Sequence, residues 1–168
     1  MTSSIALVGF MGAGKSRIGR MLARRLGVPF VDTDKVIAAQ HGAISAIFAQ
    51  RGEAGFREIE RGVVLDELAA AERTARIVAL GGGAVTIAEV REALRRLPHV
   101  VWLDAPPQVL FARAQSGARP LARDEAAFEA LYAQRQPLYG EVSTAVVRTT
   151  GREGLSWVVD KVIAAVAA

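Results

Sequence analysis

A stretch near the start of the chain has the residue types and spacing to hold a phosphate group. Residues 9–16 read GFMGAGKS, in which Gly14, Lys15 and Ser16 follow Gly9 at the spacing of a phosphate-binding loop. In such a loop glycine lets the backbone approach an anion closely, the lysine reaches the outer phosphates and the hydroxyl holds Mg²⁺. A nucleoside triphosphate is therefore the expected ligand.

The sequence on either side of this loop supports the same interpretation. The loop follows an apolar run at 5–8 and precedes a helical pattern at 17–26. The positive end of that helix would face the bound phosphates. The alternative is a glycine-rich turn with no ligand, which the strand–loop–helix context disfavours.

Two aspartates follow the second apolar run, in the stretch VDTD. Asp32 and Asp34 are two residues apart, so on an extended chain they would point to opposite sides. One would help to hold Mg²⁺, which prefers carboxylate and phosphate oxygens, and the other would orient or deprotonate an acceptor hydroxyl. The alternative is that Asp34 caps the helical stretch 35–39, because aspartate is a favoured N-cap.

An arginine further along stands between two acids at helical spacing. Arg57 shares one helix face with Glu53, four residues before it, and Glu60, three residues after it. An arginine held in this way fits a carboxylate substrate, which its guanidinium can bind with two parallel hydrogen bonds. The alternative is a solvated row of salt bridges.

Glycines and arginines in the later loops offer further contacts to an anion. Three successive glycines, Gly81, Gly82 and Gly83, follow the third apolar run and predict close approach of the backbone to a ligand, with a plain loop as the alternative. Arg119 and Arg135 each stand near a proline, where a surface role is the alternative. The polar, Gly- and Pro-containing segment 115–126 is predicted to be a mobile lid.

Apolar runs alternate with helical patterns, and this order would position the residues above. Alternating strands and helices predict an α/β fold with a five-stranded parallel sheet, whose ligands lie beyond the carboxyl ends of the strands. The expected strands are 5–8, 29–31, 77–80, 100–103 and 144–147. The expected helices are 17–26, 53–71, 87–97, 108–115, 125–134 and 155–167.

Composition favours a small cytoplasmic enzyme. A chain of 168 residues suits one domain, 1–168, and the absence of cysteine excludes disulfides and metal–thiolate sites. No apolar run has membrane-spanning length, and the first one does not resemble a signal peptide. The net charge of +4 reflects scattered arginines with few aromatic residues. We therefore expect an anionic small substrate, no nucleic acid, no membrane and a monomer.

The motifs together resemble the shikimate kinase family. They are GxxGxGKS at 9–16, DTD at 32–34, GExxFRxxE at 52–60, LGGGAV at 80–85, RPL at 119–121 and RxPLY at 135–139. The similarity runs from about residue 5 to about residue 152. It implies a nucleoside monophosphate kinase-like P-loop fold with a mobile lid, and transfer of the γ-phosphoryl group of ATP, with Mg²⁺, to the 3-hydroxyl of shikimate.

The resemblance also implies a role for particular residues. The catalytic positions are Lys15, Asp34 and Arg119. The ATP positions are Gly12, Ala13, Gly14, Lys15, Ser16, Arg17, Arg113, Arg119 and Arg152. The substrate positions are Asp34, Arg57, Gly81, Gly82, Gly83 and Arg135, and the metal positions are Ser16 and Asp32. Members commonly have threonine where this chain has Arg17. The change is harmless if the position contacts the nucleotide through its backbone amide, and weakens nucleotide binding if the contact is made by the hydroxyl.

Two other functions compete with this one. The first is another small P-loop kinase that acts on gluconate or a nucleoside monophosphate. The aspartate pair, Arg57 and the three glycines argue against it, because a nucleotide acceptor would need a pocket for its base. The second is a nucleotide-binding protein without catalytic activity. Such a protein would be expected to have lost Lys15, Asp34 or Arg119, all of which are present.

Overall fold

Five parallel strands form one sheet in the computed structural model, which describes residues 3–116 and 124–168. The strands are β1 (Ile5–Val8), β2 (Phe30–Asp32), β3 (Ile77–Ala79), β4 (His99–Asp104) and β5 (Ala145–Arg148). They lie in the order β2-β3-β1-β4-β5, and every neighbouring pair is parallel. The predicted five-stranded parallel sheet of an α/β fold is confirmed.

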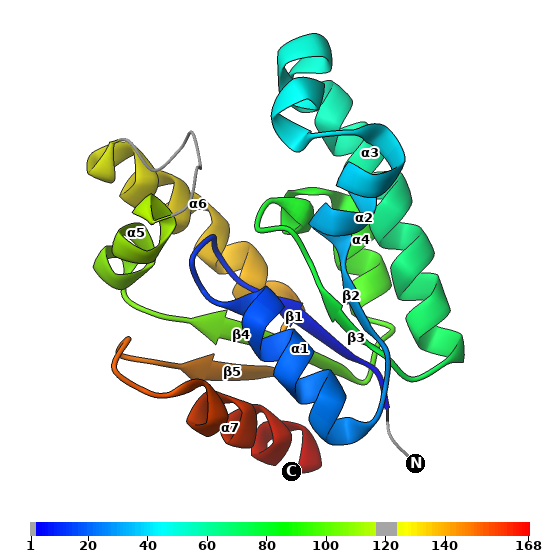
Figure 1. The fold of residues 1–168 in the computed structure, drawn as a ribbon, viewed down its shortest axis with the longest axis vertical. Helices are drawn as coiled ribbons and strands as arrows, with labels where there is room; N and C mark the ends of the chain where they lie inside the picture. Colours follow the sequence, from blue (N-terminus) through cyan, green and yellow to red (C-terminus); the bar gives the residue numbers. More distant parts are fainter. Residues whose placement is uncertain (1–2, 117–123) are drawn as a thin grey trace.

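Helices cover both faces of this sheet (Figure 1). They are α1 (Lys15–Leu26), α2 (Thr33–His41), α3 (Ile44–Arg73), α4 (Ala88–Leu94), α5 (Pro107–Gln115), α6 (Glu125–Val142) and α7 (Leu155–Ala167), with a 3₁₀ turn, η1, at Ala84–Thr86. Helices α1 and α7 cover one face, whereas α3, α4 and α6 lie on the other.

The central strand β1 shows why the sheet needs two helical layers. All four of its residues are buried. Ala6 and Val8 belong to the core shared with α3, α4 and α6, while Ile5 and Leu7 belong to the core shared with α1 and α7. Successive side chains of a strand point to opposite faces, so an uninterrupted apolar run can be buried only where both faces are covered.

Helix α3 contains a break that coincides with a predicted boundary. Its residues 44–73 include Gly52, whose φ of 68° and ψ of −175° are not helical. The segment after this glycine corresponds to the helix expected over 53–71. A small separate apolar cluster joins the two parts of α3 to α2: it contains Ile37 of α2, Ile47 before the break, and Phe56 and Val63 after it. The turns before the break fall within a substrate-binding helical region predicted at about 33–61, although no separate helix was predicted over 44–51.

Helix α6 extends further than predicted. The expected end at residue 134 is wrong, because the helix continues through Pro137 to Val142. Proline removes one backbone hydrogen bond from a helix interior, which is why the sequence favoured an end before it. Burial of Arg135, Tyr139 and Val142 against the core outweighs that loss.

Two further expectations concern the chain as a whole. No helix within 3–116 and 124–168 is long and apolar enough to cross a membrane. Of the predicted lid at 115–126, residues 117–123, including Arg119, lie outside the described residues. The lid therefore stays a prediction.

Candidate active site

The phosphate-loop motif connects β1 to α1, as predicted. Gly12 has a φ of +84°, and a Cβ atom there would lie 2.5 Å from the carbonyl oxygen of Leu110, so only glycine fits. The side chain of Lys15 lies across the loop, where its Nζ donates to the carbonyl oxygens of Gly9 at 2.7 Å and Phe10 at 3.1 Å. The backbone of the loop thus wraps around its own lysine.

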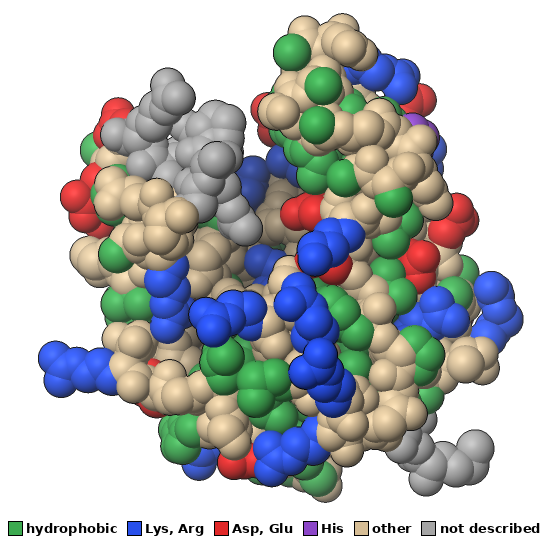
Figure 2. All heavy atoms as spheres, in the orientation of Figure 1, with side chains coloured by type: hydrophobic (Ala, Val, Ile, Leu, Met, Phe, Trp, Pro, Cys, Tyr) green, Lys and Arg blue, Asp and Glu red, His purple; other side chains and the backbone are tan. Residues whose placement is uncertain are grey.

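A cavity of about 530 Å³ opens beside this loop. Figure 2 shows a hollow between the α5–α6 side and the α2–α3 side of the molecule, with Lys and Arg atoms inside it. Most of the predicted nucleotide and metal residues line the cavity, together with two predicted substrate residues. These are Gly12, Ala13, Gly14, Lys15, Ser16, Arg17, Asp32, Asp34, Gly82 and Arg113.

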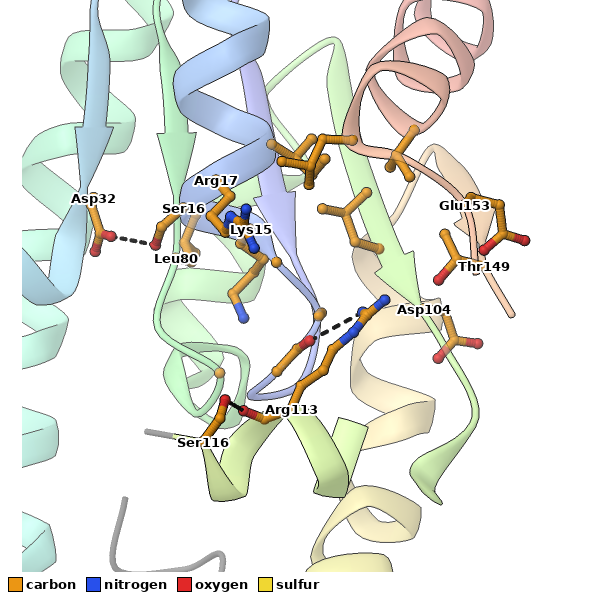
Figure 3. Close-up of a pocket in the computed structure, with 18 of the residues that line it drawn as sticks. Lys15, Ser16, Arg17, Asp32, Leu80, Asp104, Arg113, Ser116, Thr149 and Glu153 are labelled. Atoms are coloured by element: carbon orange, nitrogen blue, oxygen red, sulfur yellow. Dashed lines mark hydrogen bonds between the residues drawn. The ribbon is translucent and has the colours of Figure 1, made fainter. Parts of the chain in front are cut away.

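The capping alternative gave the N-cap of the helix to Asp34, but in the structure the other aspartate of the VDTD stretch is the cap. Asp32, and not Asp34, is the N-cap of α2: its Oδ1 accepts from the backbone N–H groups of Asp34 at 3.1 Å and Lys35 at 3.4 Å. Its Oδ2 accepts from the Ser16 hydroxyl at 2.5 Å (Figure 3). Both residues line one cavity, where Asp32 accepts from Ser16 and Asp34 lies close to Gly81.

Arg57 is held by a buried carboxylate. Its Nη1 lies 2.5 Å from Oε2 of Glu60, whose side chain is 1% exposed, whereas the carboxylate of Glu53 is 3.6 Å away and 69% exposed. The alternative of a solvated row of salt bridges is therefore wrong for the pair of Arg57 and Glu60. Burial raises the pKa of Glu60, Asp34 adds to the rise, and the cations of Arg57 and Arg135 oppose it.

Two of the three glycines, Gly81 and Gly83, lie directly against these charged side chains. A Cβ atom on Gly81 would lie 2.6 Å from Oδ1 of Asp34 and 2.9 Å from Oε1 of Glu60. On Gly83 it would lie 2.2–2.5 Å from the guanidinium atoms of Arg57. The close approach predicted for this loop is therefore made, at these two positions, by the chain's own side chains, and Gly82 borders the cavity.

Arg135 completes the cluster from α6. Its side chain is buried, so the surface alternative is wrong for this residue, and its guanidinium carbon lies 5.6 Å from the centre of the Phe10 ring. Burial lowers the pKa of Arg135, and the cation of Arg57 lowers it further. Among the described residues its buried Nε has no hydrogen-bond partner. We name the following residues the acceptor cluster: Asp34, Arg57, Glu60, Gly81, Gly82, Gly83 and Arg135.

Several predicted residues lie elsewhere, and several residues of the site escaped prediction. Arg152 is exposed and does not line the cavity, and Arg119 falls outside the described residues. The sequence predicted Glu60 only as a partner of Arg57, and not as a residue of the site. Its burial could have been predicted from its position on the apolar face of α3, at helical spacing from Phe56 and Val64, where an apolar residue is expected. The cavity residues Asp104, Thr149 and Glu153 carried no motif and were missed.

Comparisons with known proteins agree with this site. The profile of the shikimate kinase family matches residues 11–167. The shikimate kinase of Symbiobacterium thermophilum is 44% identical, over 89% of this chain and 88% of that protein. The shikimate kinase of Halorhodospira halophila is 47% identical, over 89% of this chain and 85% of that protein.

Solved structures give the same answer. The structure of shikimate kinase from Acinetobacter baumannii in complex with shikimate has a TM-score of 0.89 and 36% identity, covering 97% of this chain and 92% of that one. A gluconokinase from Sinorhizobium meliloti, at 16% identity and a TM-score of 0.57, shares only the fold.

The parallel sheet, the phosphate loop and the helices around them define a P-loop kinase of small molecules. More particularly, the chain belongs to the shikimate kinase family. It is therefore an enzyme, a kinase that phosphorylates shikimate at the expense of ATP.

The contact between Gly83 and Arg57 yields a first prediction. Gly83→Ala should raise the KM for shikimate about tenfold, because the new methyl group displaces a guanidinium whose charge-assisted hydrogen bonds are worth more than about 1.4 kcal/mol. Stability should also fall, because displacing the guanidinium weakens its ion pair with the buried Glu60 carboxylate, although φ at Gly83 is −95° and the backbone itself is not strained. Steady-state kinetics and thermal melting measure both effects.

Gly62→Ala is the matched control. Gly62 lies on α3, five residues after Arg57, and a Cβ atom there meets nothing within 4 Å. This variant should keep the parent KM. If the KM for shikimate is unchanged in Gly83→Ala, the position of the Arg57 guanidinium does not require glycine at residue 83.

The buried Glu60 carboxyl predicts a dependence of stability on pH. Its folded pKa is raised, so between the unfolded value of about 4.3 and the higher folded value the folded state binds more protons, and stability falls as pH rises. Glu60→Gln cannot titrate. Relative to this variant, the parent should lose free energy of unfolding from about pH 4 upward and level off above the folded pKa. Urea denaturation across this pH range tests the prediction. It is contradicted if the free energy of unfolding of the parent rises with pH relative to that of Glu60→Gln.

Proposed function

We propose that the acceptor cluster binds shikimate and that the cavity beside the phosphate loop binds ATP. The γ-phosphoryl group would then pass from ATP to the 3-hydroxyl of shikimate. The observation that supports two separate binding regions is the position of Asp34. It lines the cavity with Lys15, and its Oδ1 is so close to Gly81 that a Cβ atom there would lie 2.6 Å away. One carboxylate thus stands at the boundary between the two binding regions, where an acceptor hydroxyl must meet the terminal phosphate.

The phosphate loop supplies the donor side of the reaction. In this proposal Gly12, Ala13 and Gly14 offer backbone N–H groups to the phosphates, at the positive end of α1. Lys15 leaves the loop carbonyls that it now contacts and neutralises the transferred phosphate. Arg17 contributes its backbone amide, so the absence of a hydroxyl at this position does not weaken binding.

Mg²⁺ fits the pair formed by Ser16 and Asp32. A hydroxyl oxygen and a carboxylate oxygen already lie 2.5 Å apart there, and both are the hard ligands that Mg²⁺ prefers. Among the described residues there is no group of three or more acidic or histidine side chains that could hold a metal alone. This agrees with an ion that also takes phosphate oxygens and water. When bound, Mg²⁺ supplies positive charge to the phosphates.

The acceptor cluster supplies the other side. Arg57 and Arg135 would bind the carboxylate of shikimate, for which two adjacent guanidinium groups are suited. Asp34 would accept the proton of the attacking hydroxyl as the oxygen–phosphorus bond forms. The bond from the γ-phosphorus to the β-phosphate oxygen breaks at the same time, so the products are ADP and shikimate 3-phosphate. Arg119 would approach the transferred phosphate from the predicted lid.

The resemblance also implies contacts to the nucleoside. Arg113 and Arg152 are proposed to lie near the nucleoside. Arg113 already touches the phosphate loop, where its Nη1 donates to the carbonyl oxygen of Gly12 at 3.3 Å. The expected monomeric state and cytoplasmic location stay predictions.

A coupled assay of ADP formation tests the substrate. Shikimate should accelerate ATP consumption strongly, whereas gluconate and AMP should not, because AMP has no carboxylate for the two arginines and this chain shares only its fold with a gluconokinase. Lys15→Ala should abolish turnover yet still bind shikimate in a calorimetric titration, since the two substrates use different residues. Equal stimulation by gluconate would overturn the choice of acceptor, and the absence of any stimulation would favour a protein that only binds nucleotide.

Asp34→Asn tests the proposed proton acceptor. Positioned proton acceptance is worth about 10²–10⁴-fold, so kcat should fall at least about a hundredfold. The melting temperature should hardly move, because the helix cap belongs to Asp32. The KM for ATP should stay near the parent value. Asp66→Asn, an exposed carboxylate on α3, is the control. A kcat within a few-fold of the parent would leave Asp34 with no catalytic role.

A further inference from the structure

The loop between β5 and α7 forms one wall of the cavity. Thr149, Glu153 and Gly154 line it, followed by Leu155 and Val158 of α7. In Figure 3, Thr149 and Glu153 lie across the cavity from Ser16 and Asp32, with Lys15 between the two sides. Because the metal and the acceptor are proposed to lie beside Ser16, Asp32 and Asp34, with the phosphates at Lys15, the wall opposite is left for the nucleoside.

The chemistry of the wall agrees with that assignment. Leu155 and Val158 of α7 line the cavity together with Leu103 of β4, and the three belong to one apolar cluster. An aromatic base can pack on such a surface, whereas phosphate cannot. The wall is therefore suited to the part of ATP that carries no charge.

One carboxylate holds the backbone of this loop in place. Both oxygens of Glu153 lie 3.0 Å from the backbone nitrogen of Thr150, which donates to them. The Thr150 hydroxyl donates to Oε1 at 3.0 Å, and the backbone N–H of Gly151 donates to Oε2 at 3.1 Å. The pKa of Glu153 is lowered, chiefly by the N–H of Thr150, so the carboxylate stays ionised near neutral pH.

The ends of the loop are fixed by other contacts. The backbone N–H of Thr149 donates to the carbonyl oxygen of Asp104 at 2.9 Å. Gly151 has a φ of +91° and lies so close to α5 that a Cβ atom would be 2.6 Å from Cγ1 of Val109. Between these anchors the loop is largely exposed and contributes nothing to the buried core, so the Glu153 hydrogen bonds are its main internal restraint.

We propose that Glu153 is a positioning residue for the nucleoside of ATP. Its carboxylate gathers the donors of Thr150 and Gly151 and so keeps the loop in the shape that walls the cavity. The residue acts through the loop and touches no reacting atom. The inference rests on the proposed function in one respect, that a nucleotide occupies this cavity.

Binding of two different ligands tests whether Glu153 affects the nucleoside alone or the whole nucleotide site. Calorimetric titration of the full-length chain with ADP reports phosphates and nucleoside together, while inorganic tripolyphosphate reports the phosphate loop alone. Glu153→Ala should raise the Kd for ADP about tenfold, as expected from losing hydrogen bonds to a charged group, and should leave the Kd for tripolyphosphate within about twofold. Glu153→Gln should have a smaller effect on ADP, because its amide oxygen still accepts. It also keeps the volume of the side chain should the alanine variant fail to fold.

Kinetics give a second readout. In the presence of shikimate, the Glu153 variants should raise the KM for ATP while kcat and the KM for shikimate stay within about twofold. Glu72→Gln is the control, an acid that pairs with Arg96 at 2.9 Å on the surface and does not line the cavity. It should match the parent.

Either of two results would overturn the proposal. The first is a Kd for ADP that neither Glu153 variant changes, and the second is an equal loss of ADP and tripolyphosphate affinity, which would assign the loop to the phosphate site. ADP binding needs no acceptor, so these outcomes do not depend on whether shikimate is the substrate. A failure of the shikimate assay alone would therefore count against the proposed function and not against Glu153.

Discussion

The buried ion pair between Arg57 and Glu60 is the interaction on which the acceptor cluster depends. Removing a carboxylate from water is costly, and an arginine at 2.5 Å offsets that cost only when the geometry is good and other groups help. Here a second arginine, Arg135, contributes positive charge to the same carboxylate. Glu60 thereby fixes one arginine directly and attracts another, so two cations that repel each other can stay close together in a buried place.

The fold brings the parts of this cluster together from distant points in the sequence. Asp34 comes from the start of α2, Arg57 and Glu60 from α3, the three glycines from the end of β3, and Arg135 from α6. Because β2, β3 and β1 are neighbours and parallel, the segments that follow them all emerge at one edge of the sheet. The phosphate loop emerges at the same edge after β1, and this is why one cavity reaches both binding regions.

The sequence predicted the sheet, the phosphate loop and half of the residues that line the cavity, because these rest on local patterns. Apolar runs identify buried strands, and the loop motif is contiguous. It did not predict the end of α6, where burial of Tyr139 outweighs a proline, nor the role of Asp32 as the cap of α2, which depends on where the chain leaves the strand. Glu60 was predicted only as a partner of Arg57, and its burial was missed because burial depends on how α3 packs against the rest of the fold. Glu153 was missed because its hydrogen bonds to Thr150 and Gly151 depend on the turn that the loop makes.

The double engagement of Asp32 has a thermodynamic consequence for α2. One oxygen of this carboxylate caps the helix and the other accepts from Ser16, so the same group serves the helix that carries Asp34 and the proposed metal position. Anything that draws the carboxylate toward a cation therefore changes the free energy of the first turn of α2. Linkage of this kind is reciprocal. The order of that first turn, and with it the placement of the proposed proton acceptor, is coupled to whether the donor nucleotide has brought its metal ion.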